Sequence, residues 1–296
     1  MSGPPWMVSL HGGHSREFCE HAQGTLRSTL EEAVRRGLRV YGLSEHAPRS
    51  EDRFLYASER AKGYTVARLG REFEEYARAS RVLQREFRGR LEVLRGFETE
   101  AVPRSGYAAE MRALASEHGF DYVVGSVHHV KDISIDESPA HFRAAAAACG
   151  GIDALLERYY ATVVEVIEEI RPQVVAHLDL PKLYAPEGSD LPGLAARKAA
   201  KAAIKAARTR NCILDLNTAA LRKGLREPYP SAWLVRLAKD AGVPFCFGDD
   251  SHSPGQVGYG IPRARLYLLR LGVETVTVLR RSSDGIRRQE VDLTRP

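Results

Sequence analysis

The sequence has few cysteines and no long apolar run, and each shortage excludes a class of protein. Its four cysteines, Cys19, Cys149, Cys212 and Cys246, are scattered and form no CxxC pair. A disulfide framework is therefore not expected, and a reducing cytoplasm fits best. No window approaches the roughly 18 consecutive apolar residues that a membrane-spanning helix needs. The opening MSGPPWMVSL lacks the basic start and apolar stretch of a secretory signal, so we expect none.

Two kinds of binding signature are also missing. Neither GxGxxG nor a P-loop follows any expected strand, which disfavours the nucleotide-binding folds. The formal charge is +5, but the basic residues, largely arginine, are mixed with glutamates along helical segments such as REFEEYARASRVLQREFRGR. No basic stripe interleaved with aromatic residues is visible, so nucleic acid is not the expected partner. The cationic surplus suits instead a small substrate that carries phosphate.

What the sequence does contain is a regular alternation of helical and extended patterns. In TLRSTLEEAVRRG, apolar residues recur at helical spacing, Thr25 is suited to cap the start and Gly37 to end the helix. Further helices are expected near 64–87, 108–118, 152–170, 193–208, 231–242 and 262–271. Strands are expected near 7–15, 38–46, 91–100, 121–129, 173–180, 212–217, 244–252 and 274–281.

These strands are short and nearly all apolar, as strands buried on both faces of a parallel sheet are. Repeated strand–helix units over about 250 residues are typical of a (β/α) barrel. An open, doubly wound sheet is the alternative. The length of 296 residues fits one large α/β domain or two small ones. We expect a single domain over residues 1–296.

Histidines and acidic residues gather at the carboxyl ends of the expected strands. Of the ten histidines, eight lie at these ends or just after them, the exceptions being His118 and His141. The strand-end residues are His11, His14, His21, Glu45, His46, Glu98, Glu100, His128, His129, His177, Asp179, Asp215, Asn217, Asp249, Asp250 and His252.

In a parallel barrel all these ends meet on one face, where active sites are built. Imidazoles and carboxylates concentrated there are what zinc, iron or manganese requires. More than four such groups indicate more than one ion, and a carboxylate that bridges two ions is typical of phosphate-ester hydrolases. His177 would then face a metal cluster, and Asp179, two residues on, is suited to orient an imidazole.

The motifs HGGHSREFCEHAQGT, YGLSEHAPR, GFETE, VGSVHHVKDISID, VVAHLDLPKLY, DLNTAALRKGLREPYPS and GDDSHSPGQVG together resemble the polymerase-and-histidinol-phosphatase (PHP) superfamily. The resemblance covers nearly the whole chain and is nearest to the histidinol-phosphatase branch. It implies a distorted seven-stranded (β/α) barrel with a trinuclear metal site. Members hydrolyse phosphate esters, and some act as nucleases.

The resemblance also implies which residues bind two or three divalent ions, with zinc, iron and manganese all acceptable. The implied ligands are His14, His21, His46, Glu98, His128, His177, Asp250 and His252. One position departs from the family pattern HxH, because Gly12 stands where the first histidine belongs and His11 lies one residue earlier. Either the glycine pair lets His11 swing into place, which we favour, or the site has lost a ligand.

The implied reaction is hydrolysis of L-histidinol phosphate to L-histidinol and phosphate, with Glu98, Asp250 and His252 at the reacting centre. The leaving alkoxide needs a proton or a cation, for which Asp250 and His252 are candidates and His129 a weaker one. Glu45, Glu100 and Asp136 are expected to support ligands or to lie on the surface. Asp215 and Asn217 are as readily structural as catalytic.

The loop after the strand at 212–217 reaches the same face of the barrel. Arg222, Lys223 and Arg226 are candidates to hold the substrate phosphate, and Arg222 is favoured because arginine grips phosphate with paired hydrogen bonds. A solvated loop face is the plainer interpretation of the other two. Tyr229 either packs beside the substrate imidazole or anchors the loop.

Two other functions stay open. One is a PHP phosphoesterase acting on a nucleotide or a nucleic-acid end, which the basic charge favours. The other is a PHP domain whose metal site has decayed, which Gly12 favours. Metal analysis would distinguish the PHP domain with a decayed site from the two enzymes. The sequence carries no indication of oligomeric state.

Overall fold

Seven parallel strands form the centre of the computed structural model, which describes residues 3–186 and 192–295. Their order in the sheet is β1-β2-β3-β4-β7-β8-β9. The strands are β1 (Val8–Ser9), β2 (Val40–His46), β3 (Glu92–Glu98), β4 (Tyr122–Gly125), β7 (Val174–Val175), β8 (Ile213–Asn217) and β9 (Phe245–Gly248).

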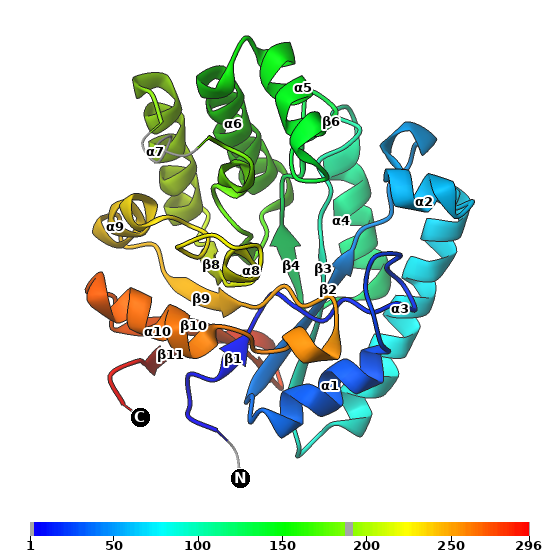
Figure 1. Cartoon of the computed structure of the whole chain (residues 1–296). Coiled ribbons are helices and arrows are strands. Elements are labelled where there is room, and N and C mark those ends of the chain that lie inside the picture. The colour runs from blue at the N-terminus through cyan, green and yellow to red at the C-terminus, as the bar shows by residue number, and fades with distance from the viewer. Residues whose placement is uncertain (1–2, 187–191, 296) are drawn as a thin grey trace.

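Helices surround these strands (Figure 1). They are α1 (Leu26–Arg35), α2 (Ala57–Ala61), α3 (Val66–Glu86), α4 (Tyr107–His118), α5 (Pro139–Cys149), α6 (Ile152–Ile170), α7 (Leu194–Thr209), α8 (Ala219–Arg222), α9 (Ala232–Asp240) and α10 (Ile261–Arg270). In the part of the chain that the structure covers, no helix combines the length and the apolar character needed to traverse a bilayer.

The last strand returns to the first and nearly closes the sheet. The Leu10 amide donates to the Phe247 carbonyl at 2.8 Å, and the Asp249 amide donates to the His11 carbonyl at 2.9 Å. The predicted (β/α) barrel is thereby confirmed, and the open doubly wound sheet is wrong. Because every strand is parallel to its neighbours, all seven carboxyl ends point to one face.

Local sequence accounts for the first helix as expected. The Thr25 side chain accepts a hydrogen bond from the Ser28 amide and so caps α1. Leu26, Leu30 and Ala33 are buried on its inner face. Gly37 follows the helix with φ +76°, a conformation that glycine adopts without steric cost.

Tyr122 at the start of β4 fills the barrel interior. Its hydroxyl donates to the Leu10 carbonyl at 2.9 Å. A Cβ atom on Gly42 would lie 2.1 Å from that hydroxyl, and one on Gly96 would lie 2.5 Å from the ring. The two glycines therefore make room for a large aromatic plug, above which the strand ends carry the polar site.

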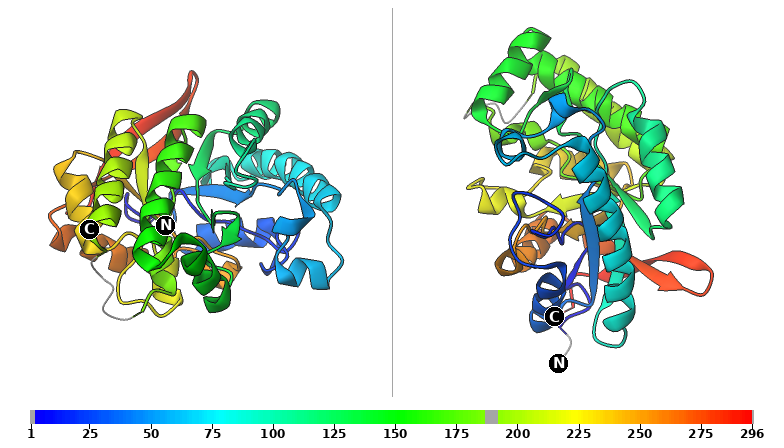
Figure 2. Two further views of the ribbon diagram at one scale, coloured as in Figure 1. Left: turned by 90° about the horizontal axis from the view of Figure 1, so that it is seen from above. Right: turned by 90° about the vertical axis from the view of Figure 1, so that its right-hand side faces the viewer.

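The segment expected as a final strand does not join the barrel. β10 (Thr275–Ser282) pairs antiparallel with β11 (Gly285–Asp292), and this hairpin projects from the barrel (Figure 2). β11 was not predicted, because most of its side chains are exposed and its RRQE stretch lacks apolar alternation. A second small hairpin, β5 (His129–Val130) with β6 (Ile133–Ser134), follows β4 directly.

Candidate metal centre

Glu98, the last residue of β3, lies at the centre of the polar face and is 1% exposed. Its Oε1 atom faces three imidazoles from three other strand ends. It lies 3.0 Å from His177 Nε2, 3.3 Å from His128 Nε2 and 3.4 Å from His11 Nε2. All three histidines are buried. We call His11, His128 and His177 the inner group.

The other oxygen of Glu98 faces a second set of imidazoles. Oε2 lies 3.0 Å from His46 Nδ1 and 3.9 Å from His14 Nε2. The His14 ring stacks on the His252 ring with centroids 4.1 Å apart. We call His14, His46 and His252 the outer group. Glu98 therefore has one oxygen turned to each group, as a carboxylate that bridges two cations does.

Asp250 lies against both groups. Its Oδ1 atom is 3.6 Å from His14 Nε2 and 3.5 Å from His252 Nδ1. An Asp250 carboxylate oxygen also lies within 4.8 Å of ligand nitrogens of His11 and His177. Asp250 thus reaches the centre from the end of β9 and adds carboxylate oxygens to the nitrogen atoms of both groups.

The glycine pair between His11 and His14 lets both histidines reach this centre. A Cβ atom on Gly12 would lie 2.1 Å from Asp249 Oδ1 and 2.8 Å from the Tyr41 hydroxyl. Gly13 has φ +79°, which side chains other than glycine rarely adopt. The backbone therefore passes close to β2 and β9 here, and the His11 ring comes within 3.4 Å of Glu98 despite the extra residue.

Three buried carboxylates orient three of these imidazoles. Asp215 Oδ2 lies 2.8 Å from His11 Nδ1, Glu45 Oε1 lies 3.0 Å from His14 Nδ1, and Glu100 Oε2 lies 3.3 Å from His128 Nδ1. Each contact occupies Nδ1 and leaves Nε2 turned toward Glu98. A carboxylate behind a ligating imidazole is a common way to fix its orientation and raise its basicity.

The sequence left the roles of Asp215, Glu45 and Glu100 open, although a usable signal was present. Glu100 follows Glu98 by two residues, and Glu45 immediately precedes His46 at the next strand end. Asp179 differs from expectation, because its carboxylate accepts from the Ser231 amide at 2.9 Å and lies 3.3 Å from Lys182 Nζ. These contacts tie it to the loop after β8 and differ from the predicted role of orienting an imidazole.

Attraction between imidazoles and carboxylates governs the pKa values of His11 and Glu98 in and beside the inner group. Burial disfavours the protonated form of His11, but Glu98, Asp215 and Asp250 outweigh that effect and raise its pKa. Burial likewise disfavours ionised Glu98, yet His11, His128 and His46 hold the pKa of its carboxyl well below the usual range. In the outer group, burial and the neighbouring His14 hold the pKa of His252 well below its ordinary value.

The donor atoms at the centre fit a cation. Among the described residues, four buried atoms that face it lack a hydrogen-bond partner: His11 Nε2, His14 Nε2, His46 Nδ1 and Glu98 Oε2. Buried polar atoms are almost always paired, so a converging set of unpaired lone pairs indicates a positive ligand. Imidazole nitrogens with carboxylate oxygens are the mixture that zinc, iron and manganese accept.

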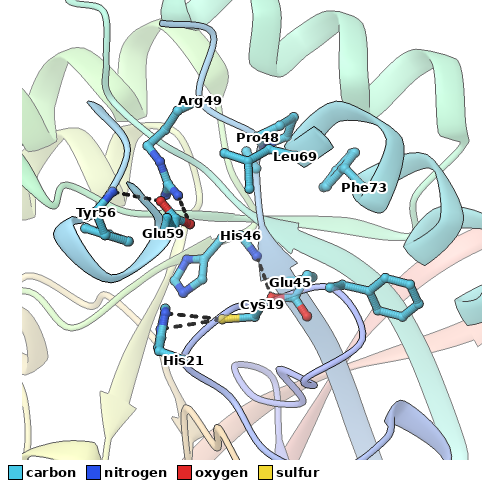
Figure 3. A pocket seen from close by; sticks show the side chains of 12 residues that line it. Cys19, His21, Glu45, His46, Pro48, Arg49, Tyr56, Glu59, Leu69 and Phe73 are labelled. Carbon is cyan, nitrogen blue, oxygen red and sulfur yellow. Dashed lines mark hydrogen bonds and ion pairs between the residues drawn. The ribbon is translucent and has the colours of Figure 1, made fainter. Parts of the chain in front are cut away.

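His21 and Cys19 lie beside the outer group in a pocket between β2 and α3 (Figure 3). The His21 ring is exposed, with centroids 4.8 Å from His252 and 5.7 Å from His46. The buried Cys19 sulfur is 3.4 Å from His21 Nδ1. Arg49 also lines this pocket, and sequence reasoning missed it; it is buried and paired with Glu59.

Arg222 braces the turn that carries Asp250. Its Nη1 donates to the Asp249 carbonyl at 2.5 Å and its Nη2 to the Asp250 carbonyl at 2.6 Å. Asp250 itself has φ +48°, a strained value for a residue other than glycine. These contacts differ from the phosphate grip expected of Arg222. Lys223 is exposed on the same loop.

Tyr229 is fully buried, which bears on its two interpretations. Its amide and carbonyl pair with the backbone of Asn217 at 3.0 and 2.7 Å. Its ring meets the His177 ring edge-on, with centroids 6.3 Å apart. This placement favours an anchor for the loop after β8 over a platform for the substrate imidazole.

Comparison with known proteins is consistent with this geometry. The model of the PHP domain matches residues 11–219. The "Probable histidinol-phosphatase" of Schizosaccharomyces pombe is 32% identical over 282 residues, which cover 94% of this chain and 91% of the relative.

Two crystal structures share the fold. HisK from Listeria monocytogenes has a TM-score of 0.75 at 24% identity, covering 86% of this chain and 99% of that one. Histidinol phosphate phosphatase from Lactococcus lactis, complexed with zinc, L-histidinol and phosphate, has a TM-score of 0.67 at 18% identity, covering 92% and 95%. With the matched domain running from His11 through β8, and a relative aligned over almost its whole length, this chain belongs to the PHP domain family.

Proposed function

We propose that the protein hydrolyses L-histidinol phosphate to L-histidinol and phosphate. The observation that carries the proposal is Glu98, whose two oxygens face two separate groups of buried imidazoles. The substrate is supported by the name of the Schizosaccharomyces pombe relative and by the L-histidinol and phosphate in the Lactococcus lactis structure. We further propose that residues 1–296 act as one domain. A reducing, cytoplasmic setting is supported by the four free cysteines.

The site would hold two or three divalent ions, with zinc, iron and manganese as the candidates. The inner group would hold one ion, the outer group with His21 a second or third, and Glu98 and Asp250 would lie between them. The proposed ligands are His11, His14, His21, His46, Glu98, His128, His177, Asp250 and His252. Bound cations lower the pKa of water and neutralise charge on the phosphate oxygens during in-line displacement.

The residues of the chain supply orientation. Asp215, Glu45 and Glu100 hold three imidazoles with Nε2 toward the centre, so that the cations that would face the phosphate meet prearranged ligand atoms. Asp250 is placed to orient the attacking water by accepting its hydrogen bond, because its carboxylate lies at the centre and Arg222 holds its backbone. His252, with 22% of its side chain exposed, reaches the rim where the alcohol leaves.

The test measures phosphate release from L-histidinol phosphate after the metal-free protein is reloaded with zinc, manganese or iron(II) in turn. We expect turnover with at least one metal, and no turnover for Glu98→Ala. A parallel digest of a short oligonucleotide separates this reaction from a nuclease. Inactivity on L-histidinol phosphate with all three metals would overturn the proposal.

A further inference from the structure

The small hairpin after β4 is followed by an acidic side chain, one residue beyond a backbone hydrogen bond to the inner group. In the β5–β6 hairpin His129 pairs with Ser134, and the Ile135 amide donates to the His128 carbonyl at 2.9 Å. The next residue, Asp136, is half-buried. Its Oδ1 atom accepts a hydrogen bond of 3.4 Å from the Ser134 hydroxyl. The chain therefore folds back onto the backbone of its own proposed metal ligand, and the partly exposed Asp136 follows that contact directly.

Asp136 lies where several loops of the carboxyl face meet. Burial raises the pKa of Tyr184, which follows β7, and the Asp136 carboxylate raises it further. Burial also raises the pKa of Tyr229, which follows β8, and among the carboxylates that add to the effect are Asp136 and Asp250. The Tyr229 hydroxyl is buried without a hydrogen-bond partner among the described residues. One polar corner is thus shared by the β5–β6 hairpin and the segments after β7 and β8.

Within residues 3–186 and 192–295, the carboxylate of Asp136 has no ion-pair partner, whereas the acids on either side of it each lie near a nitrogen atom. Asp132 lies 3.2 Å from the Arg53 guanidinium, and Glu137 lies 3.7 Å from the His141 imidazole. A half-buried carboxylate held by one long hydrogen bond is poorly compensated. It can gain from a positive ligand that enters the mouth of the barrel.

We propose that Asp136 binds the ammonium group of the substrate and so selects phosphate esters of amino alcohols. The inference rests on the proposed function. In L-histidinol phosphate the ammonium is attached to the carbon next to the CH2–O–phosphate. When the phosphate lies at Glu98, the ammonium therefore lies at the rim of the same face. A carboxylate that accepts a hydrogen bond from an ammonium makes one of the stronger polar contacts, because both partners are charged.

The test compares two substrates that differ only in this group: L-histidinol phosphate and its des-amino analogue, 3-(imidazol-4-yl)propyl phosphate. We expect Asp136→Asn to lower kcat/KM for L-histidinol phosphate by about 10- to 100-fold, the range for a hydrogen bond between charged groups. Most of the loss should appear in KM. The value for the analogue should stay within about twofold, because that substrate has no group for Asp136 to bind.

Asp132→Asn is the matched control, since it removes a carboxylate from the same hairpin region that is already paired with Arg53. It should leave both substrates unchanged, and Asp136→Glu should retain part of the preference for the amine. An Asp136→Asn variant that keeps the wild-type ratio, or that loses both substrates equally, overturns the inference. A wild-type enzyme inactive on L-histidinol phosphate would overturn the proposed function itself, so the two failures are distinguishable.

Discussion

The inner and outer groups of imidazoles share Glu98 but are held in different ways. Every inner histidine is within 3.4 Å of Glu98 Oε1 and is at most 4% exposed. Of the outer histidines only His46 lies as near to Glu98, at 3.0 Å from Oε2. The three outer rings stack, with His14 4.1 Å from His252 and 4.4 Å from His46 between ring centroids. His252 and His46 also reach the surface in part.

This difference indicates how much each group depends on a cation. In the inner group carboxylates face imidazoles directly. The negative charge of these carboxylates is therefore balanced largely by the protein itself. In the outer group burial and the neighbouring His14 lower the pKa of His252, whereas at His46 the effect of burial is outweighed by Glu98, which raises the pKa. The stacked His14 and His252 rings would be brought together by a cation that both bind. We therefore expect the ion of the outer group to be held less firmly.

The largest expected effect comes from removing what the two groups share. Glu98→Gln keeps the volume of the side chain but removes the charge that faces both groups. We expect at least about a thousandfold loss of kcat together with a loss of bound metal, as for the removal of a central electrostatic group. Phosphate release and metal content per chain give the measurement. A variant that retains most of its metal would show that the groups are independent of Glu98.

Substituting one histidine from each group tests the comparison directly. His177→Gln removes a buried inner nitrogen, and we expect about a hundredfold loss of activity. The buried Glu98 oxygen that faces His177 would lose a partner for its negative charge. His252→Gln removes a partly exposed outer nitrogen, and we expect about a tenfold loss, at the lower end of the effect of one metal-site contact. Steady-state kinetics with excess metal would quantify both.

Metal titration of the same two variants provides the control. His252→Gln should lower the affinity for one ion and leave the remainder bound. Equal losses of metal from both variants, or a greater loss from His252→Gln, would remove the distinction between the inner and outer groups.

Asp215 offers a smaller change within the inner group. Asp215→Asn keeps the shape but weakens the acceptor that holds His11 Nδ1 at 2.8 Å. A substitution behind a ligating imidazole typically lowers metal affinity by about 10- to 100-fold, and we expect a value near the lower limit. Competition with a chromophoric chelator measures it. Glu45→Gln, behind His14, is the counterpart in the outer group, and it should affect only the more weakly held ion.

The barrel and the convergence of its polar strand ends could be predicted from the sequence. Parallel order follows from apolar strands alternating with helices, and that order alone brings residues as distant as His11 and His177 to one face. The family resemblance to the PHP superfamily was confirmed as well. The barrel and the family resemblance were both predicted from patterns in the order of residues, so neither prediction required knowledge of side-chain directions.

Side-chain partners could not be predicted in the same way. Arg222 was expected to reach for phosphate, yet its two terminal nitrogens donate to the carbonyls of Asp249 and Asp250. Asp179 was expected behind an imidazole but bonds Ser231. Each depends on a bend of a few residues: φ is +89° at Asp179 and +48° at Asp250. Such local bends leave no periodic signal in the sequence.

The smallest expected effect concerns the turn that carries Asp250 to both groups. If Arg222 acts through its two backbone hydrogen bonds, Arg222→Lys and Arg222→Gln should each lower the free energy of unfolding by about 1–3 kcal/mol, because neither can clasp two carbonyls at once. Thermal or denaturant unfolding of the metal-loaded protein measures this loss. The KM for L-histidinol phosphate should be similar in the two variants. A KM that is raised in Arg222→Gln but normal in Arg222→Lys would instead indicate that Arg222 binds the substrate phosphate. A lysine keeps the positive charge that binds an anion but lacks the paired donors that hold this turn.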